Sequence, residues 1–210
     1  MFGISISEMT ECDLEIIAVM HSEVFPKDTD TALGKRYLMK MYSFFLEESD
    51  RLALVARGGA NKQIFGFLVG APTGFMRQFR RHTAGAVLTA VVSRPGMWFD
   101  PQNWRRLKIR ASALLRNRRR TGHVETNATS ADGQTGYLYY LAVSQTARRK
   151  GIGEALMSRG EEFFRVLGMK RVIFSVFLVN VDSIRLYEKW GWKQQLGGDG
   201  IRRIYGKDLD

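Results

Sequence analysis

The residues of this chain best suited to chemistry form a basic loop with two glycines, Arg148-Arg149-Lys150-Gly151-Ile152-Gly153. A strand-forming run, residues 138–143, precedes the loop, and an amphipathic stretch typical of a helix follows it. Glycine lets the backbone approach a phosphate closely, and the free N–H groups and dipole of a first helical turn favour an anion there. The three cations add attraction. The pattern predicts a cradle for a phosphate-bearing ligand.

Two other phosphate-binding motifs do not fit this run. The G-x-x-x-x-G-K-[ST] pattern of the P-loop is absent. The dinucleotide fingerprint needs a third glycine where this chain has Leu156.

The run does resemble a known signature. Arg148-x-x-Gly151-x-Gly153, after a strand that ends Leu141-Ala142-Val143, resembles the acetyl-CoA signature of the GNAT acetyltransferase superfamily. The order of elements over residues 4–70 fits the N-terminal half of that family, and the close resemblance covers about residues 137–206.

Residues 180–192 resemble the second signature of the superfamily. Asn180 stands at the expected start of a helix, and Tyr187 follows seven residues later, shortly before Gly191 and Trp192. The layout is similar to that of bacterial members with an Arg- and Leu-rich insertion before the cofactor-binding strand.

The resemblance implies acetyl-CoA as co-substrate and Tyr187 as the general acid for the leaving thiolate. It implies that backbone groups of residues 141–143 pair with the pantetheine arm and that the amides of residues 149–153 hold the pyrophosphate. The expected cofactor-binding residues are Leu141, Ala142, Val143, Arg148, Arg149, Lys150, Gly151, Ile152, Gly153, Asn180 and Ser183. Simpler interpretations remain open: core packing for Tyr187, a helix cap for Asn180 and a solvated loop charge for Arg148.

The general base is not evident from the sequence. Many relatives have a carboxylate at the start of the cofactor strand, but residues 136–140 contain no acid. Glu23 and Asp28, near the end of the first predicted helix, are candidates, and solvated surface acids are the alternative for both. The lone cysteine, Cys12, is remote from the motif, which favours direct transfer, with a backbone amide near Val143 stabilising the oxyanion.

These residues require a scaffold of strands and helices in a definite order. Apolar periodicity predicts strands at 3–7, 52–56, 64–70, 137–143, 171–179, 192–195 and 201–206, and helices at 13–25, 33–46, 151–167 and 180–190. Residues 27–31 are expected to form a polar loop. The fold class is therefore α/β in the mixed α+β sense, a GNAT-like central mixed sheet with helices on both faces. We expect one domain over 1–210 with a basic helical insertion at about 71–135.

The charge of the chain is concentrated in that insertion. The formal net charge is +11, and residues 75–120 carry twelve basic residues and one acid, so the remainder is balanced. The segment predicts an anionic partner, either a membrane surface or an anionic carrier of the substrate. A solvated helical pair that shields the active site is the simpler interpretation, and we do not expect a nucleic acid partner.

Other site classes are disfavoured by composition. One cysteine excludes an intrachain disulfide framework, and the three histidines lack the spacing of a metal site, so no metal is expected. Because no secretory signal or membrane-spanning run is evident, we expect a cytoplasmic enzyme that docks peripherally at most.

The sequence thus predicts an acetyl-CoA-dependent N-acetyltransferase acting on a small-molecule amine, such as a nucleotide- or lipid-linked amino sugar. The alternatives are a protein N-terminal or lysine acetyltransferase, and a non-catalytic module that senses acyl-CoA or binds nucleic acid.

Overall fold

Seven strands form one mixed sheet in the computed structural model, which describes residues 3–59, 62–93, 133–198 and 200–209. The strand order is β1-β2-β3-β4-β5-β7-β6, and only β4 and β5 pair in parallel. The strands are β1 Ile4–Glu8, β2 Leu52–Gly58, β3 Gln63–Pro72, β4 Thr135–Val143, β5 Arg171–Phe177, β6 Lys193–Gly198 and β7 Arg202–Asp208. The one parallel pair lies in the middle of the sheet and defines the place of the candidate site.

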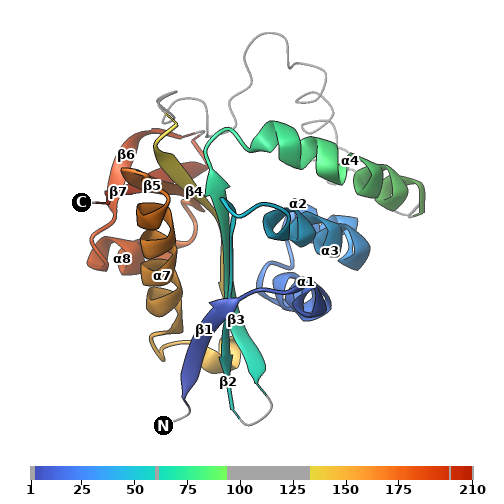
Figure 1. The fold of residues 1–210 in the computed structure, drawn as a ribbon, viewed down its shortest axis with the longest axis horizontal. Helices are drawn as coiled ribbons and strands as arrows, with labels where there is room; N and C mark the ends of the chain where they lie inside the picture. Colours follow the sequence, from blue (N-terminus) through green and yellow to red (C-terminus); the bar gives the residue numbers. More distant parts are fainter. Residues whose placement is uncertain (1–2, 60–61, 94–132, 199, 210) are drawn as a thin grey trace.

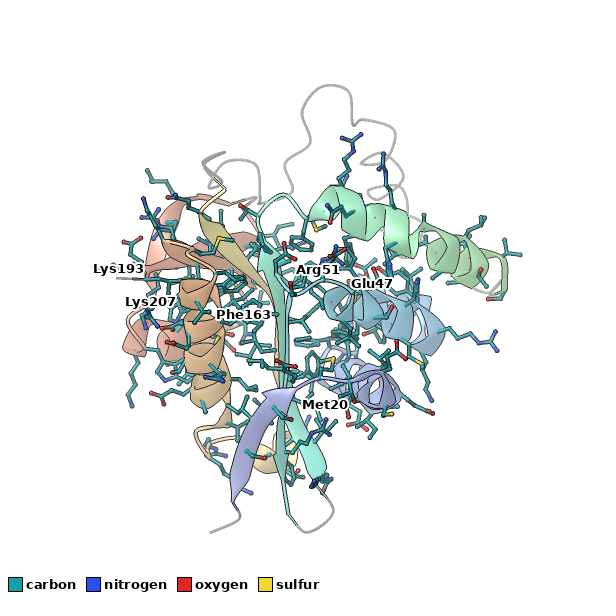
Figure 2. All side chains as sticks on the ribbon, viewed as in Figure 1. Met20, Glu47, Arg51, Phe163, Lys193 and Lys207 are labelled. Atoms are coloured by element: carbon teal, nitrogen blue, oxygen red, sulfur yellow. The ribbon has the colours of Figure 1, made fainter. Side chains whose placement is uncertain are left out.

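Helices cover both faces of the sheet (Figure 1). Four helices lie on one face: α1 Leu14–Val24, α2 Thr29–Leu33, α3 Lys35–Ser43 and α4 Met76–Ser93. On the other face lie α7 Ile152–Val166 and α8 Val181–Lys189. Figure 2 shows Met20 of α1 and Phe163 of α7 on opposite sides of the sheet. The predicted fold class is confirmed.

Each face of the sheet has its own apolar core. The inner strands β2 and β3 are buried along almost their whole length, as expected for strands covered on both sides. Phe67 and Val69 of β3 point into the core under α1–α4, whereas Leu68 points into the core under α7. The alternation along one strand therefore supplies both cores.

The prediction of a polar loop at residues 27–31 is wrong in part, because α2 begins within it. The Asp28 side chain accepts a hydrogen bond from the Asp30 N–H at 3.4 Å, which caps the first turn. Gly34, with φ of 85°, ends the helix in a conformation that favours glycine. The cap at Asp28 and the glycine at the end of the helix therefore favour a short helix in a segment whose polar composition suggested a loop.

Of the predicted insertion, at about 71–135, only residues 71–93 and 133–135 lie within the described residues. Strand β3 continues to Pro72, and α4 then forms the described part of the basic segment. Phe75 and Phe79 bury their rings against Phe44 and Phe45 in the 3₁₀ turn that follows α3, and Tyr139 of β4 packs against Phe79. Aromatic packing thus fixes α4 over the sheet. The predictions for residues 94–132 lie outside the described residues.

Candidate functional site

Strands β4 and β5 separate in the middle of the sheet. They pair from Thr135 with Arg171 to Leu138 with Phe174, and β4 then continues to Val143. On the opposite edge of β4, pairing with β3 continues to the end of the strand. The last half of β4 is therefore bordered by β3 on one side and by an opening on the other.

The hydrogen-bond alternation of β4 shows which backbone groups face this opening. The Ser144 N–H donates to the Phe65 carbonyl at 2.8 Å, so residues 144 and 142 point their backbone groups toward β3. Those of Leu141 and Val143 consequently point away from β3, toward the opening. Ala142, which the sequence grouped with them, uses its backbone within the sheet and has a buried side chain. Two of the three residues are placed to pair with an extended ligand.

A β-bulge lies where the strands begin to separate. Val69 pairs with Tyr140 and Gly70 pairs with Leu138, which leaves Tyr139 as an extra residue on β4. The rings of Tyr139 and Tyr140 both pack into the core on the α1–α4 side. The bulge therefore brings two phenols to the same face beside the opening.

The basic loop has the backbone form of an anion cradle. Arg149 and Gly151 have positive φ angles of 60° and 76°, while those of their neighbours Arg148 and Lys150 are not positive. When the sign of φ alternates along the chain in this way, consecutive backbone N–H groups point toward a common concavity. Arg148, Arg149 and Lys150 are all exposed. The Arg148 Nε also donates to the Val143 carbonyl at 3.3 Å, a long hydrogen bond.

Helix α7 adds free amides to this loop. Its N-cap is Gly151, which has no side-chain capping bond, and the Ala155 N–H donates to the Gly151 carbonyl at 3.0 Å. The N–H groups of residues 152–154 precede that bond and have no acceptor inside the helix. The structure thus places Ile152 and Gly153 at a helix N-terminus suited to a phosphate.

Three elements converge at Gly153. A Cβ built on this residue would lie 3.4 Å from the ring of Trp190, at the end of α8, and 3.8 Å from the Val143 side chain of β4. Both separations are ordinary van der Waals contacts, so internal packing does not demand glycine here. A ligand that approaches the backbone closely would demand it.

Helix α8 brings Tyr187 close to the opening from the other face. Its ring packs edge-on against Phe174, the last β5 residue that pairs with β4, with ring centroids 4.5 Å apart. Among the described residues its hydroxyl has no hydrogen-bond partner. Burial raises the pKa of Tyr187 to about 12, so this phenol keeps its proton.

The start of α8 agrees with the helix cap expected from sequence. Asn180 is the N-cap, and its side-chain oxygen accepts from the Ser183 N–H at 3.4 Å. Asn180 is exposed and Ser183 is half-buried. The structure thus shows Asn180 as a helix cap, and contact of Asn180 and Ser183 with the cofactor stays a prediction.

The two candidate bases differ in their surroundings. Glu23 is exposed, and no polar contact of its side chain is found within the described part of the chain. Asp28 is half-buried and accepts a hydrogen bond from the Tyr140 hydroxyl. Sequence reasoning missed Asp30, which is 2% exposed and accepts from the same hydroxyl at 2.9 Å. No local pattern links these acids with a tyrosine on β4.

Comparison with known proteins assigns the family. The model of the acetyltransferase (GNAT) family matches residues 20–192, which is most of the chain. The protein belongs to the GNAT acetyltransferase family. The family predicted from the two signatures is thereby confirmed, including its reach into the N-terminal half.

One curated relative is the mycothiol acetyltransferase of Thermobispora bispora. This GNAT chain is 34% identical to it over 95 residues, which are 45% of this chain and 31% of that protein. The matched part therefore spans about a third of the length of the relative, and the relative's activity and substrate do not transfer directly.

Solved structures show the same fold. YncA of Salmonella typhimurium, solved with acetyl-CoA, has a TM-score of 0.57 and 14% identity, covering 99% of this chain and 94% of that one. The PaiA N-acetyltransferase of Thermoplasma acidophilum, solved with coenzyme A, has a TM-score of 0.57 and 15% identity, covering 98% and 99%. Both ligands agree with the cofactor predicted for this member of the family.

Two further findings bear on other kinds of site. In the parts of the chain that the structure describes, no helix is long and apolar enough to cross a membrane. Over the same ranges, no three His, Cys, Asp or Glu side chains are grouped as ligands for a metal ion.

Proposed function

We propose that this protein is an acetyl-CoA-dependent N-acetyltransferase that passes the acetyl group directly to a primary amine of a small molecule. One observation carries the proposal: the opening beside β4 and the anion cradle before α7 are joined by a short connection. A ligand with a diphosphate and an extended hydrogen-bonding arm would contact both. The resemblance to GNAT enzymes identifies acetyl-CoA as such a ligand.

The residues present fit this cofactor. The amides of residues 149–153 would hold the diphosphate, and backbone groups of Leu141 and Val143 would pair with the arm. When bound, the cofactor supplies an activated acetyl thioester. The Val143 N–H faces the same opening and would stabilise the negative charge that develops on the acetyl oxygen.

The balance of the reaction requires two proton movements. A bond forms between the amine nitrogen and the acetyl carbon, and the carbon–sulfur bond breaks. An amine that enters as ammonium loses two protons, of which one ends on sulfur and one goes to solvent. We assign the donation to sulfur to the Tyr187 hydroxyl, whose phenolate then regains one of the two amine protons by way of solvent.

Direct transfer is favoured over a covalent acyl-enzyme. The only cysteine of the chain, Cys12, is exposed on the short 3₁₀ helix Glu11–Asp13, before α1. The amine would then attack the thioester directly, and the reaction would be accelerated because the protein holds the two groups next to each other.

The basic segment 75–120 bears on the acceptor. In its described part, Arg77 and Arg81 on α4 are exposed. A nucleotide- or lipid-linked amino sugar would present both an amine and phosphate charges to this surface. The curated relative is named for mycothiol rather than for a protein acceptor, which also favours a small molecule.

A screen of amines with acetyl-CoA tests the proposal. Release of free coenzyme A is followed with a thiol reagent in the presence of amino sugars, nucleotide-linked amino sugars, polyamines and peptides. Amine-dependent release supports the proposal, and release with peptides only would favour a protein acetyltransferase. Tight binding of acetyl-CoA without release would indicate a sensor, and nucleic acid retained through a high-salt wash would indicate a binding module.

A further inference from the structure

The ring of Trp190, at the end of α8, contacts two parts of the candidate site. Its edge would lie 3.4 Å from a Cβ on Gly153, in the first turn of α7. The same ring packs against that of Tyr187 in a T-shaped arrangement, with centroids 5.9 Å apart. One side chain therefore touches both the anion cradle and the phenol that the proposed function assigns to the leaving sulfur.

The backbone at the end of α8 fixes the place from which this ring projects. The Trp192 N–H donates to the Tyr187 carbonyl at 3.1 Å. The Gly191 N–H donates to the Glu188 carbonyl at 3.0 Å, and Gly191 has a φ angle of 84°, in the left-handed region that favours glycine. These features form a Schellman motif, which ends a helix in a defined geometry. The helix end thus sets where Trp190 stands relative to Tyr187.

The contact with Gly153 holds the end of α8 against the start of α7. An indole is large and has only two side-chain torsions, so it fills the space between two helices at a low cost in conformational entropy. Trp190 and Tyr187 both pack against the core on this face of the sheet. A smaller side chain at position 190 would leave a gap beside Gly153, and the neighbouring groups would shift to fill part of it.

Packing of its ring determines where the Tyr187 hydroxyl lies. Within the described ranges this hydroxyl has no hydrogen-bond partner that would hold it in place. The ring is held by Phe174 of β5, with centroids 4.5 Å apart, and by Trp190. Because a misplacement of about 1 Å can lower a rate by about 10²-fold, loss of either contact should impair proton donation.

We propose that Trp190 is a positioning residue for the transfer: it holds the Tyr187 hydroxyl at a fixed distance from the cradle, where the diphosphate of the cofactor would lie. The inference rests on the proposed function. The cradle and the phenol would contact different parts of one ligand, so the separation between them must match that ligand. Trp190 contacts both and therefore sets this separation. It takes no part in proton transfer itself and acts through Tyr187.

The test compares the wild type with Trp190→Leu, which removes the ring, and with Trp190→Phe, which keeps an aromatic one. Phe163→Leu is the matched control, because Phe163 of α7 is also half-buried and packs against the same core, but it is not in the first turn of the helix. Circular dichroism verifies folding, and calorimetry measures the affinity for acetyl-CoA. Single-turnover transfer is measured at saturating acetyl-CoA with the most active of glucosamine, putrescine, ethanolamine and glycinamide.

We expect the rate of transfer to fall by about 5–50-fold in Trp190→Leu and by less than about threefold in Trp190→Phe and in Phe163→Leu, with the affinity for acetyl-CoA within about threefold of the wild type. Because Trp190 acts through the Tyr187 hydroxyl, the effects of the two residues should not add. In the Tyr187→Phe background, Trp190→Leu should lower the rate by less than about a further threefold.

Binding of coenzyme A gives a second readout that needs no turnover. Since the Trp190 ring lies next to the cradle, coenzyme A should change the tryptophan fluorescence of the wild type. The change should persist in Phe163→Leu and be largely lost in Trp190→Leu.

Several results would overturn this inference: a loss of rate of less than about threefold in Trp190→Leu, an equal loss in Phe163→Leu, or a loss of affinity for acetyl-CoA as large as the loss of rate. Full additivity of Trp190→Leu with Tyr187→Phe, or an unchanged fluorescence response in Trp190→Leu, would overturn it as well. A wild type that releases no coenzyme A with any acceptor in the full amine screen would instead refute the proposed function itself.

Discussion

Replacement of Tyr187 by phenylalanine isolates the role of one hydroxyl. The ring packs against Phe174 and Trp190, with centroid separations of 4.5 and 5.9 Å, and phenylalanine preserves both contacts. Since the hydroxyl has no hydrogen-bond partner among the described residues, its removal should change the free energy of unfolding by less than about 0.5 kcal/mol. A change in rate would then report on chemistry and not on the fold.

The pKa of Tyr187 sets the expected magnitude. A thiol has a pKa near 8.5, so full proton transfer from a phenol with a pKa of about 12 is uphill by about 5 kcal/mol. With the pKa that it has in the cofactor-free protein, the Tyr187 hydroxyl stabilises the departing sulfur first through a hydrogen bond, which precedes the transfer of the proton. A hydrogen bond to a charged group contributes about 1.5–3 kcal/mol, which corresponds to a loss of about 10–150-fold in Tyr187→Phe.

The assay is single-turnover transfer measured by chemical quench, because slow product release would mask the loss in steady-state kcat. Tyr205→Phe is the control: its hydroxyl donates to Glu188 at 2.7 Å, and its ring stacks on Phe174 with centroids 5.9 Å apart. The control should lose some stability but little rate. A loss of less than about threefold in Tyr187→Phe would refute the donor role and return this tyrosine to core packing.

Three further predictions concern the cradle, an ion pair and the basic segment. Gly153→Val should sharply weaken acetyl-CoA binding, measured by calorimetry. Gly153→Ala, whose Cβ would lie 3.4 Å from Trp190, should remain folded. Unchanged affinity for acetyl-CoA in a folded Gly153→Val variant would refute the cradle. Burial raises the pKa of Asp13, but hydrogen bonds, led by that from Arg57, outweigh it and lower the pKa overall. Arg57→Gln should therefore cost about 2 kcal/mol above about pH 4 in urea unfolding, and the difference should shrink as the pH falls through the lowered pKa; a constant difference would contradict this. The protein should co-sediment with anionic vesicles through segment 75–120, and this binding should weaken at high salt. A variant with glutamine at four positions should bind these vesicles less than the wild type does: Arg116, Arg118, Arg119 and Arg120. Equal binding of the wild type to neutral and anionic vesicles would reject docking.

The sequence predicted the cradle because every feature of it is local. The end of β4, the basic loop and the first turn of α7 are consecutive, and the glycine spacing reports directly on backbone conformation. The helix cap at Asn180 is local in the same way. Such features need no knowledge of how distant segments pack.

The contact of Asp28 and Asp30 with Tyr140 was not predictable because its parts are far apart in the chain. Asp28 and Tyr140 are 112 residues apart, and neither has a neighbour pattern that suggests the other. Tyr140 points to this face only because the bulge at Tyr139 shifts the strand by one residue. A strict alternation along β4 would have placed Tyr139 and Tyr140 on opposite faces.

The two tyrosines beside the opening differ in their hydrogen-bond partners. Burial raises the pKa of both Tyr140 and Tyr187, so both remain protonated, but Tyr140 already has two carboxylates as acceptors. The Tyr140 hydroxyl donates to Asp28 and also contacts Asp30, whereas that of Tyr187 has no acceptor among the described residues. The two phenols pack into cores on opposite faces of the sheet. The phenol that the proposed function assigns to the leaving sulfur therefore lies on the α7–α8 side of the sheet, away from the carboxylates that accept from Tyr140.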